Sequence, residues 1–241
     1  MPPSTVRLRR VDQLLSSCGY CSRREAKGWV KQGWVTVDGV TVTSPDEKVD
    51  PARMQVEGEP LDHPDGLLVL FHKPVGTICT HEDEEGPTIY SLLPERWRHR
   101  NPPVSSVGRL DKDASGLLVL TDDGALVQKW TAPRHHVPKL YEVTLDRDPQ
   151  PEWIAVFASG TFLMPGESKP CAPARLELVG PKTARLELTE GRFHQVKRMF
   201  AGLGAVVQTL HRPRFGPFEL GTLAPGQWRV VPGIPSELMP A

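Results

Sequence analysis

The stretch "GRLDKDASGLLVL", residues 108–120, joins a charged segment to an apolar run and indicates the centre of the fold. Its last four residues are all apolar, so both faces of a strand formed here would be apolar. That pattern is typical of a central strand covered on both sides. Arg109, Asp111 and Asp113 lie in the loop that leads into this strand, where rigid sheets commonly carry catalytic groups. From the residues alone, turn positions that hydrogen-bond their own backbone are the simpler interpretation of the two aspartates.

Further short strands, with helices between them, surround this stretch. The predicted strands are "LLVLF" (67–71), "LYEVTL" (140–145) and the two "ARLEL" copies at 174–178 and 184–188, and the predicted helices are "ALVQKW" (125–130) and "FHQVKRMFAGLG" (193–204). The repeated pentapeptide indicates a hairpin, because a single repeat is too few for a solenoid. We therefore expect residues 63–241 to form an α+β domain with a mostly antiparallel mixed sheet flanked by helices.

Residues 1–62 predict a separate small domain with its linker. An apolar pattern after "RR" indicates a first helix, and "SRRE", residues 22–25, offers a capping box for a second helix that ends near Gly33. The alternating "VTVDGVTV" surrounds Asp38 and Gly39, a pair that favours a tight hairpin turn. "MQVEG" (54–58) then predicts a short strand.

The second predicted helix carries a basic stripe. It consists of Arg23, Arg24, Lys27 and Lys31. Residues 1–31 contain seven Lys or Arg against two acids, although the whole chain has a formal net charge of zero. A cationic stripe beside a helix N-terminus attracts phosphate. A solvated helix face is the alternative interpretation, and the charges alone do not decide between them.

Composition limits the other classes of function. The apolar runs are far shorter than the roughly 18 residues of a membrane span, and "MPPSTVRLRR" at the start has no apolar segment typical of a signal peptide. We therefore expect a cytoplasmic protein without a membrane partner, acting as a monomer. Cys18 and Cys21 lack a second cysteine pair, and the adjacent His135 and His136 lack a third ligand, so no metal site is expected.

Two resemblances give these patterns a function. Residues 6–50 resemble an S4 domain, a small RNA-binding module, in the helix pair, the "SRREA" segment and the hairpin. The ordered set "HKPVG", "GRLDKDASGLLVLTDDG", "TAPRHHVPKLYEVTL" and "EGRFHQVKRMF" resembles pseudouridine synthases, in the branch that carries an N-terminal S4 domain and modifies ribosomal RNA. The resemblance implies isomerisation of a uridine in ribosomal RNA, and its details point to the small-subunit (16S) enzymes. Enzymes of the large subunit (23S) are the alternative.

The resemblance also implies roles for particular residues. Asp111 matches the catalytic aspartate, Lys197 the cation that faces it, and Tyr141 the tyrosine that packs on the target base. Many related enzymes have Arg where this chain has Lys197. Arg109 is expected to fill the space that a flipped-out base leaves in the RNA, with a loop-steadying salt bridge as the alternative. Asp113, together with Asp122 and Asp123, is expected to be a turn or loop residue.

The implied chemistry requires no cofactor. The N1–C1′ bond of uridine breaks, the base turns, and C5 bonds to C1′, without hydrolysis or redox change. The carboxylate can attack C1′, remove a proton from C2′ or add to the base, and the sequence does not choose among these. Two rival functions are a noncatalytic RNA-binding or ribosome-assembly protein and a hydrolytic glycosidase. The expected partner is ribosomal RNA or an assembly intermediate of a ribosomal subunit.

Overall fold

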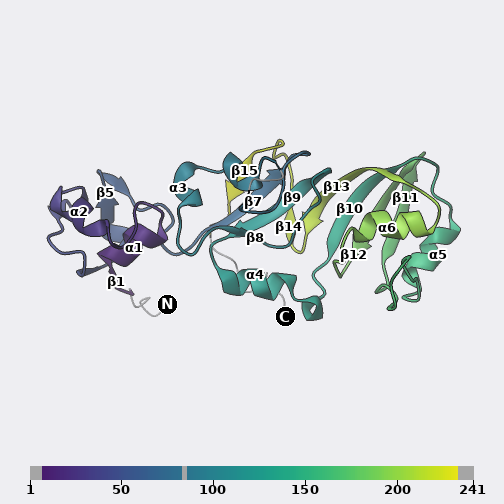
Figure 1. The fold of residues 1–241 in the computed structure, drawn as a ribbon, viewed down its shortest axis with the longest axis horizontal. Coiled ribbons are helices and arrows are strands. Elements are labelled where there is room, and N and C mark those ends of the chain that lie inside the picture. The colour runs from purple at the N-terminus through teal and green to yellow at the C-terminus, as the bar shows by residue number, and fades with distance from the viewer. Residues whose placement is uncertain (1–6, 83–85, 233–241) are drawn as a thin grey trace, which may run out of the picture. The chain divides into compact units, whose positions relative to one another are not determined.

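The computed structural model describes residues 7–82 and 86–232, which form two compact units (Figure 1). The first unit contains the described residues up to 67 together with 93–105 and 121–124. The second unit contains 68–82, 86–92, 106–120 and 125–232. Two later segments of the chain thus pack with the N-terminal residues, which the sequence patterns did not indicate.

The first unit combines short helices with small antiparallel sheets. Its elements are β1 (Arg9–Arg10), α1 (Val11–Ser17), α2 (Ala26–Lys31), β2 (Val35–Val37), β3 (Val40–Thr41), β4 (Lys48–Val49), a 3-10 helix (Pro51–Arg53), β5 (Met54–Val56), β6 (Glu59–Pro60) and α3 (Glu95–Arg98). One sheet has the order β3-β2-β5-β6, and β1 pairs with β4. The predicted hairpin is confirmed: Asp38 and Gly39 have φ of 48° and 79°, as its tight turn requires.

The second helix is shorter than predicted, although its capping box forms. The backbone N–H of Ser22 donates to the Glu25 carboxylate at 2.9 Å, and the backbone N–H of Glu25 donates to the Ser22 hydroxyl at 3.3 Å. Residues 23–25 form a hydrogen-bonded turn before α2 begins at Ala26. The helix ends before Gly33, whose φ of 76° is the left-handed conformation expected at a helix end.

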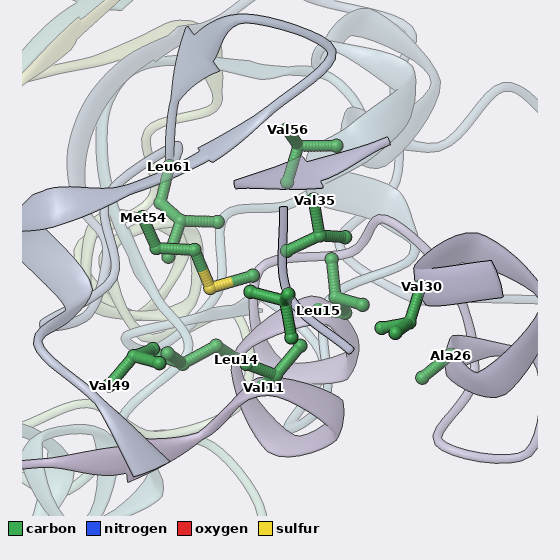
Figure 2. Packing of buried hydrophobic residues seen from close by; sticks show 11 residues of the cluster. Val11, Leu14, Leu15, Ala26, Val30, Val35, Val49, Met54, Val56 and Leu61 are labelled. Carbon is green, nitrogen blue, oxygen red and sulfur yellow. The ribbon is translucent and has the colours of Figure 1, made fainter. Parts of the chain in front are cut away.

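One apolar cluster holds the first unit together (Figure 2). Val11, Leu14 and Leu15 of α1 face Val35 of β2 and Met54 of β5, and all five are at most 1% exposed. Burial of such a side chain contributes roughly 1.5–3 kcal/mol. The cluster therefore helps to orient α1 and α2 on the sheet.

The second unit is built on a long mixed sheet. Its elements are β7 (Leu68–Lys73), a 3-10 helix (Ile89–Leu92), β8 (Ser105–Ser106), β9 (Ala114–Thr121), α4 (Gly124–Thr131), a 3-10 helix (Pro133–His135), β10 (Lys139–Leu145), α5 (Glu152–Ala158), β11 (Arg175–Gly180), β12 (Thr183–Leu188), α6 (Gln195–Gly202), β13 (Val207–Phe215), β14 (Phe218–Glu219) and β15 (Trp228–Val230). The sheet order is β11-β12-β10-β13-β9-β7-β15. Because β13 pairs parallel with β9 and antiparallel with β10, the predicted mixed, mostly antiparallel α+β fold is confirmed.

Strand β9 has the predicted central position. Leu117, Leu118, Val119 and Leu120 are each at most 1% exposed, so both faces of the strand are covered. Gly116 explains how β13 can pair so closely beside it. A Cβ at Gly116 would lie 2.4 Å from the backbone N of Arg212, and its φ of 119° also disfavours any other residue. The loop 108–113 therefore leads directly into a strand that is covered on both faces.

Asp122, which we expected to be a simple loop residue, has a structural role. Its carboxylate lies 2.8 Å from Nε of Arg100 and also accepts a hydrogen bond from the backbone N–H of Leu67 at 2.8 Å. The Arg100 side chain is 1% exposed and also donates to the carbonyl oxygens of Asp62 and His63. Asp122 does lie in a loop, as expected, but its ion pair was not predicted because the buried arginine lies 22 residues away in the sequence, where no local pattern reveals it.

The described residues contain no helix long and apolar enough to cross a membrane, and no group of three or more potential metal ligands. The four cysteines are free thiols. Cys18 is buried and Cys21 packs against the apolar cluster of the first unit, which accounts for both residues of the "CGYC" segment by packing.

Candidate active site

The second unit contains a pocket of about 660 Å³. Its walls come from the loop 108–112, the segment 188–196, and strands β10 and β13. Arg109, Asp111 and Tyr141 line this pocket, so the structure brings together three residues that lie in two distant motifs. Lys197 stands behind the wall, on α6, and reaches Asp111 from there.

Lys197 bridges two carboxylates. Its Nζ lies 3.2 Å from Oδ2 of Asp111 and 2.6 Å from Oδ1 of Asp113. The Asp111 side chain is 23% exposed, whereas that of Asp113 is 69% exposed. Asp113 therefore does more than shape the turn: it holds the lysine that faces Asp111. The predicted contact between Lys197 and Asp111 is present in the structure.

The bridge changes the protonation behaviour of its members. Burial opposes the charge of Lys197, but hydrogen bonds to Asp113 and Asp111 outweigh it and raise the pKa of the lysine. The hydrogen bond from Lys197 lowers the pKa of Asp113. Lys197 is consequently a cation and Asp113 an anion at neutral pH, so Asp113 is not available as a proton donor.

Backbone hydrogen bonds from a buried lysine fix the loop that carries Asp111. Lys73, at the end of β7, is fully buried, and its Nζ donates to the carbonyl oxygen of Ala114 at 2.7 Å and of Pro74 at 3.1 Å. Burial lowers the pKa of Lys73. The backbone N–H of Gly76 donates to the carbonyl oxygen of Lys112 at 2.7 Å. The segment "HKPVG" thus immobilises residues 112–114, a role that we did not assign to Lys73 from the sequence.

Tyr141 lies at an irregularity in the sheet. It belongs to β10, is 8% exposed, and falls where the register against β13 shifts between Leu140 and Glu142. Such bulges re-aim side chains and are common beside active sites. The guanidinium carbon of Arg212 lies 6.0 Å from the centre of the Tyr141 ring, in a cation–π arrangement.

Arg212 is a site residue that sequence reasoning missed. It is 1% exposed, lines the pocket, and donates from Nε and Nη2 to the carbonyl oxygen of Leu117 at 3.0 and 2.8 Å. It thereby joins β13 to the central strand next to Tyr141. The signal was the unusual "HRPRF" at 211–215, where charged residues alternate in a strand, but no periodic pattern marked this strand.

Two further residues complete the surroundings of Asp111. His194 has a left-handed φ of 48°, and its Nε2 lies 3.5 Å from Oδ1 of Asp111. Glu190 also lines the pocket, but its carboxylate accepts hydrogen bonds from Gln195 and from the backbone N–H of Ala172. Asp111 contacts a lysine and a histidine, and its side chain is still 23% exposed at the pocket. A ligand in the pocket can therefore reach its carboxylate.

The predicted RNA-binding residues fall into two groups. Arg24, Lys27 and Lys31 are exposed on the first unit and make no ion pair with any described residue. Arg23 is also exposed, but its guanidinium lies 3.0 Å from Asp12. Hydrogen bonds from Arg10 and Arg23 lower the pKa of Asp12.

Arg109 is exposed at the pocket and likewise has no ion pair among the described residues. The loop-steadying salt bridge that was its alternative role is not seen. Its side chain can therefore extend toward a ligand.

The chain is similar to known proteins along most of its length. Residues 67–202 match the family described as RNA pseudouridylate synthase, and residues 9–54 match the S4 domain. A ribosomal small subunit pseudouridine synthase A from Pasteurella multocida is 39% identical over 91% of this chain and 94% of its own length. The protein of that name from Escherichia coli is 37% identical over 91% of this chain and 95% of its own.

Two other matches are similar in extent. An uncharacterized RNA pseudouridine synthase from Bacillus subtilis is 38% identical over 91% of this chain and 93% of its own length. A crystal structure of a pseudouridylate synthase superposes with a TM-score of 0.63 at 33% identity and covers 92% of this chain and 95% of that one. The family match spans more than half of the chain and the relatives align along almost all of it, and the chain therefore belongs to the RNA pseudouridylate synthase family.

Proposed function

We propose that this pseudouridine synthase modifies one specific uridine of small-subunit (16S) ribosomal RNA. The observation that carries the proposal is the pocket that joins Asp111, Tyr141 and the Lys197 bridge in a chain whose full-length relatives are named small subunit enzymes. The S4 domain supports an RNA substrate. Large-subunit RNA is the second candidate, because the pocket itself recognises a uridine and not a particular ribosomal subunit.

Asp111 is the catalytic carboxylate in this proposal. It borders the pocket on the loop that Lys73 holds in place, and Lys197 opposes it at 3.2 Å. In a pocket closed by RNA, an ionised carboxylate requires such a cation nearby. Attack at C1′, proton removal from C2′ and addition to the base are all open to a carboxylate at this position.

The surroundings of Asp111 disfavour hydrolysis. A retaining glycosidase needs a second carboxyl group that first donates a proton and later activates water. Among the described residues, Asp113 shares Lys197 with Asp111, but its lowered pKa and its hydrogen bond to Lys197 keep it ionised, so it does not supply that proton. We infer that the base rejoins C1′ through C5 before water attacks.

Tyr141 and Arg109 act on the RNA in this proposal. The buried ring of Tyr141 offers a flat surface on which the target base packs. The target must leave its stack to reach the pocket, and the exposed, unpaired side chain of Arg109 can occupy the space it leaves.

The S4 unit supplies affinity through the basic stripe. Arg24, Lys27 and Lys31 are free to contact phosphates, whereas Arg23 contributes less because it also holds Asp12. We place the boundary between the S4-like part and the catalytic part at residues 62 and 63. In this proposal the enzyme acts as a monomer, in the cytoplasm, on ribosomal RNA or on an assembly intermediate of the subunit.

Loss of the C5 hydrogen tests the proposal. Transcripts of 16S and 23S RNA that contain [5-³H]uridine should release tritium to water wherever a uridine becomes pseudouridine, because C5 loses its hydrogen when it bonds to C1′. We expect release of one equivalent from 16S RNA, as naked transcript or as assembly particle, and none from 23S RNA. Release from 23S RNA alone would reassign the substrate, and no release from any of them, despite binding, would indicate a noncatalytic RNA-binding protein.

A further inference from the structure

The pocket rim carries an aromatic ring that the proposed chemistry does not use. Phe193 lines the pocket and, at 72%, is the most exposed large hydrophobic residue among those described. A single exposed apolar side chain is common and proves nothing by itself. Three further features distinguish Phe193. Hydrogen bonds fix its loop, its ring stacks on the ring of His194, and His194 in turn contacts Asp111.

Hydrogen bonds fix the loop on both sides of Phe193. The backbone N–H of Arg192 donates to Oε1 of Gln195 at 2.8 Å, and the Gln195 amide donates to Glu190 at 2.6 Å. Arg198 donates to the carbonyl oxygen of Phe193 at 3.3 Å. These hydrogen bonds fix the backbone of the loop in a conformation that leaves the phenyl ring exposed to solvent.

The ring of His194 backs the ring of Phe193. Their centroids are 3.9 Å apart and their planes differ by 17°, which is a parallel stack. His194 adopts a left-handed φ of 48°, a strained conformation for a residue other than glycine and one that concentrates at functional sites. Because Nε2 of His194 lies 3.5 Å from Asp111, the stack has a fixed position relative to the catalytic carboxylate.

We propose that Phe193, backed by His194, is a stacking platform for the nucleobase next to the target uridine. This inference rests on the proposed function, in which the target base itself enters the pocket and packs on the buried Tyr141. Extrusion of the target leaves an adjacent base without its stacking partner at the pocket mouth. Exposed aromatic rings bind such unstacked bases in single-stranded RNA, with little dependence on base identity.

Binding and crosslinking to an unmodified 16S RNA transcript test the platform. Phe193→Leu keeps an apolar side chain but removes the ring, and it should raise the Kd about tenfold, a typical effect for one lost base–aromatic stack. Phe193→Trp should restore binding. Val179→Ala, a truncation on an exposed strand outside the pocket, is the matched control and should leave the Kd unchanged. Ultraviolet irradiation should crosslink Phe193 to the nucleotide adjacent to the modified uridine.

The outcomes separate this inference from the proposed function. Absence of tritium release with the wild-type protein would refute the function, whereas Kd and crosslinking report on Phe193 without any turnover. An unchanged Kd for Phe193→Leu together with no crosslink at Phe193 would overturn the platform. A crosslink to the target uridine itself would show that Phe193 binds the flipped base and would also overturn it. Because Phe193 is exposed, Phe193→Leu should fold normally, and unchanged thermal unfolding of this variant checks that it does.

Discussion

Replacement of Lys197 by methionine removes the only charge of that side chain and keeps most of its length. The structure sets the size of the effect through the 3.2 Å distance between Lys197 Nζ and the Asp111 carboxylate. Two unit charges at this distance interact by about 1.3 kcal/mol in a water-like dielectric and about 5 kcal/mol at an effective dielectric of about 20. Because the Lys197 side chain is 25% exposed, the lower part of that range applies before RNA closes the pocket.

The direction of the effect follows from the charge of the lysine. Lys197 has a raised pKa and is charged throughout the neutral range, where it faces the Asp111 carboxylate. Without it, the positive charge beside that carboxylate is lost, and turnover at neutral pH should fall by about tenfold, which corresponds to about 1.4 kcal/mol. Lys197→Arg should be milder because it retains the charge.

Single-turnover tritium release measured against pH tests this reasoning for wild type, Lys197→Met and Lys197→Arg. Arg175→Met, which removes a cation from the exposed edge strand β11, is the matched control and should follow the wild-type profile. If Lys197→Met kept the wild-type rate at every pH, Lys197 would be a surface cation without a part in the reaction.

Three other changes probe the bridge, the stripe and the scaffold. Asp113→Asn removes the carboxylate that contributes most to the raised pKa of Lys197, so the alkaline limb of the rate profile should move to lower pH while activity at neutral pH is partly kept. An alkaline limb at the wild-type pH would show that Asp113 does not stabilise the charge of Lys197. Neutralising Arg24, Lys27 and Lys31 together should weaken RNA binding and flatten the slope of log K against log salt by about 2, with the chemical step at saturating RNA unchanged. An unaltered slope would exclude this surface. Asp122→Asn should lower the free energy of unfolding by about 3 kcal/mol, as seen in denaturant titrations, because it leaves the buried Arg100 without its counter-charge; a loss below about 1 kcal/mol would show that the pair is dispensable.

The sequence predicted the elements whose pattern is local. The apolar run of β9, the Asp38–Gly39 hairpin, the Ser22–Glu25 capping pair and the "ARLEL" hairpin all depend on neighbours within a few residues, and the structure contains each of them. The family was also predicted correctly, because its motifs are long and occur in a fixed order.

Interactions between distant segments were beyond the sequence patterns. Lys73 fixes the backbone of residues 112–114, and Arg212 joins the central strand through a carbonyl oxygen, so neither contact depends on a complementary side chain that a pattern could reveal. Asp113 was assigned to a turn because its partner Lys197 is 84 residues away. In each case one long cationic side chain donates hydrogen bonds to oxygen atoms that come within its reach only after the sheet has formed.

Asp111→Asn tests the catalytic role of Asp111 most directly. The substitution preserves size and hydrogen-bonding capacity but removes the negative charge and the attacking oxygen. Single-turnover tritium release from [5-³H]uridine-labelled 16S RNA should become undetectable, while the Kd for the same RNA stays within about twofold of wild type. A normal rate of release by Asp111→Asn would contradict the account, because Glu190, the other carboxylate among the described residues of the pocket, is held by hydrogen bonds.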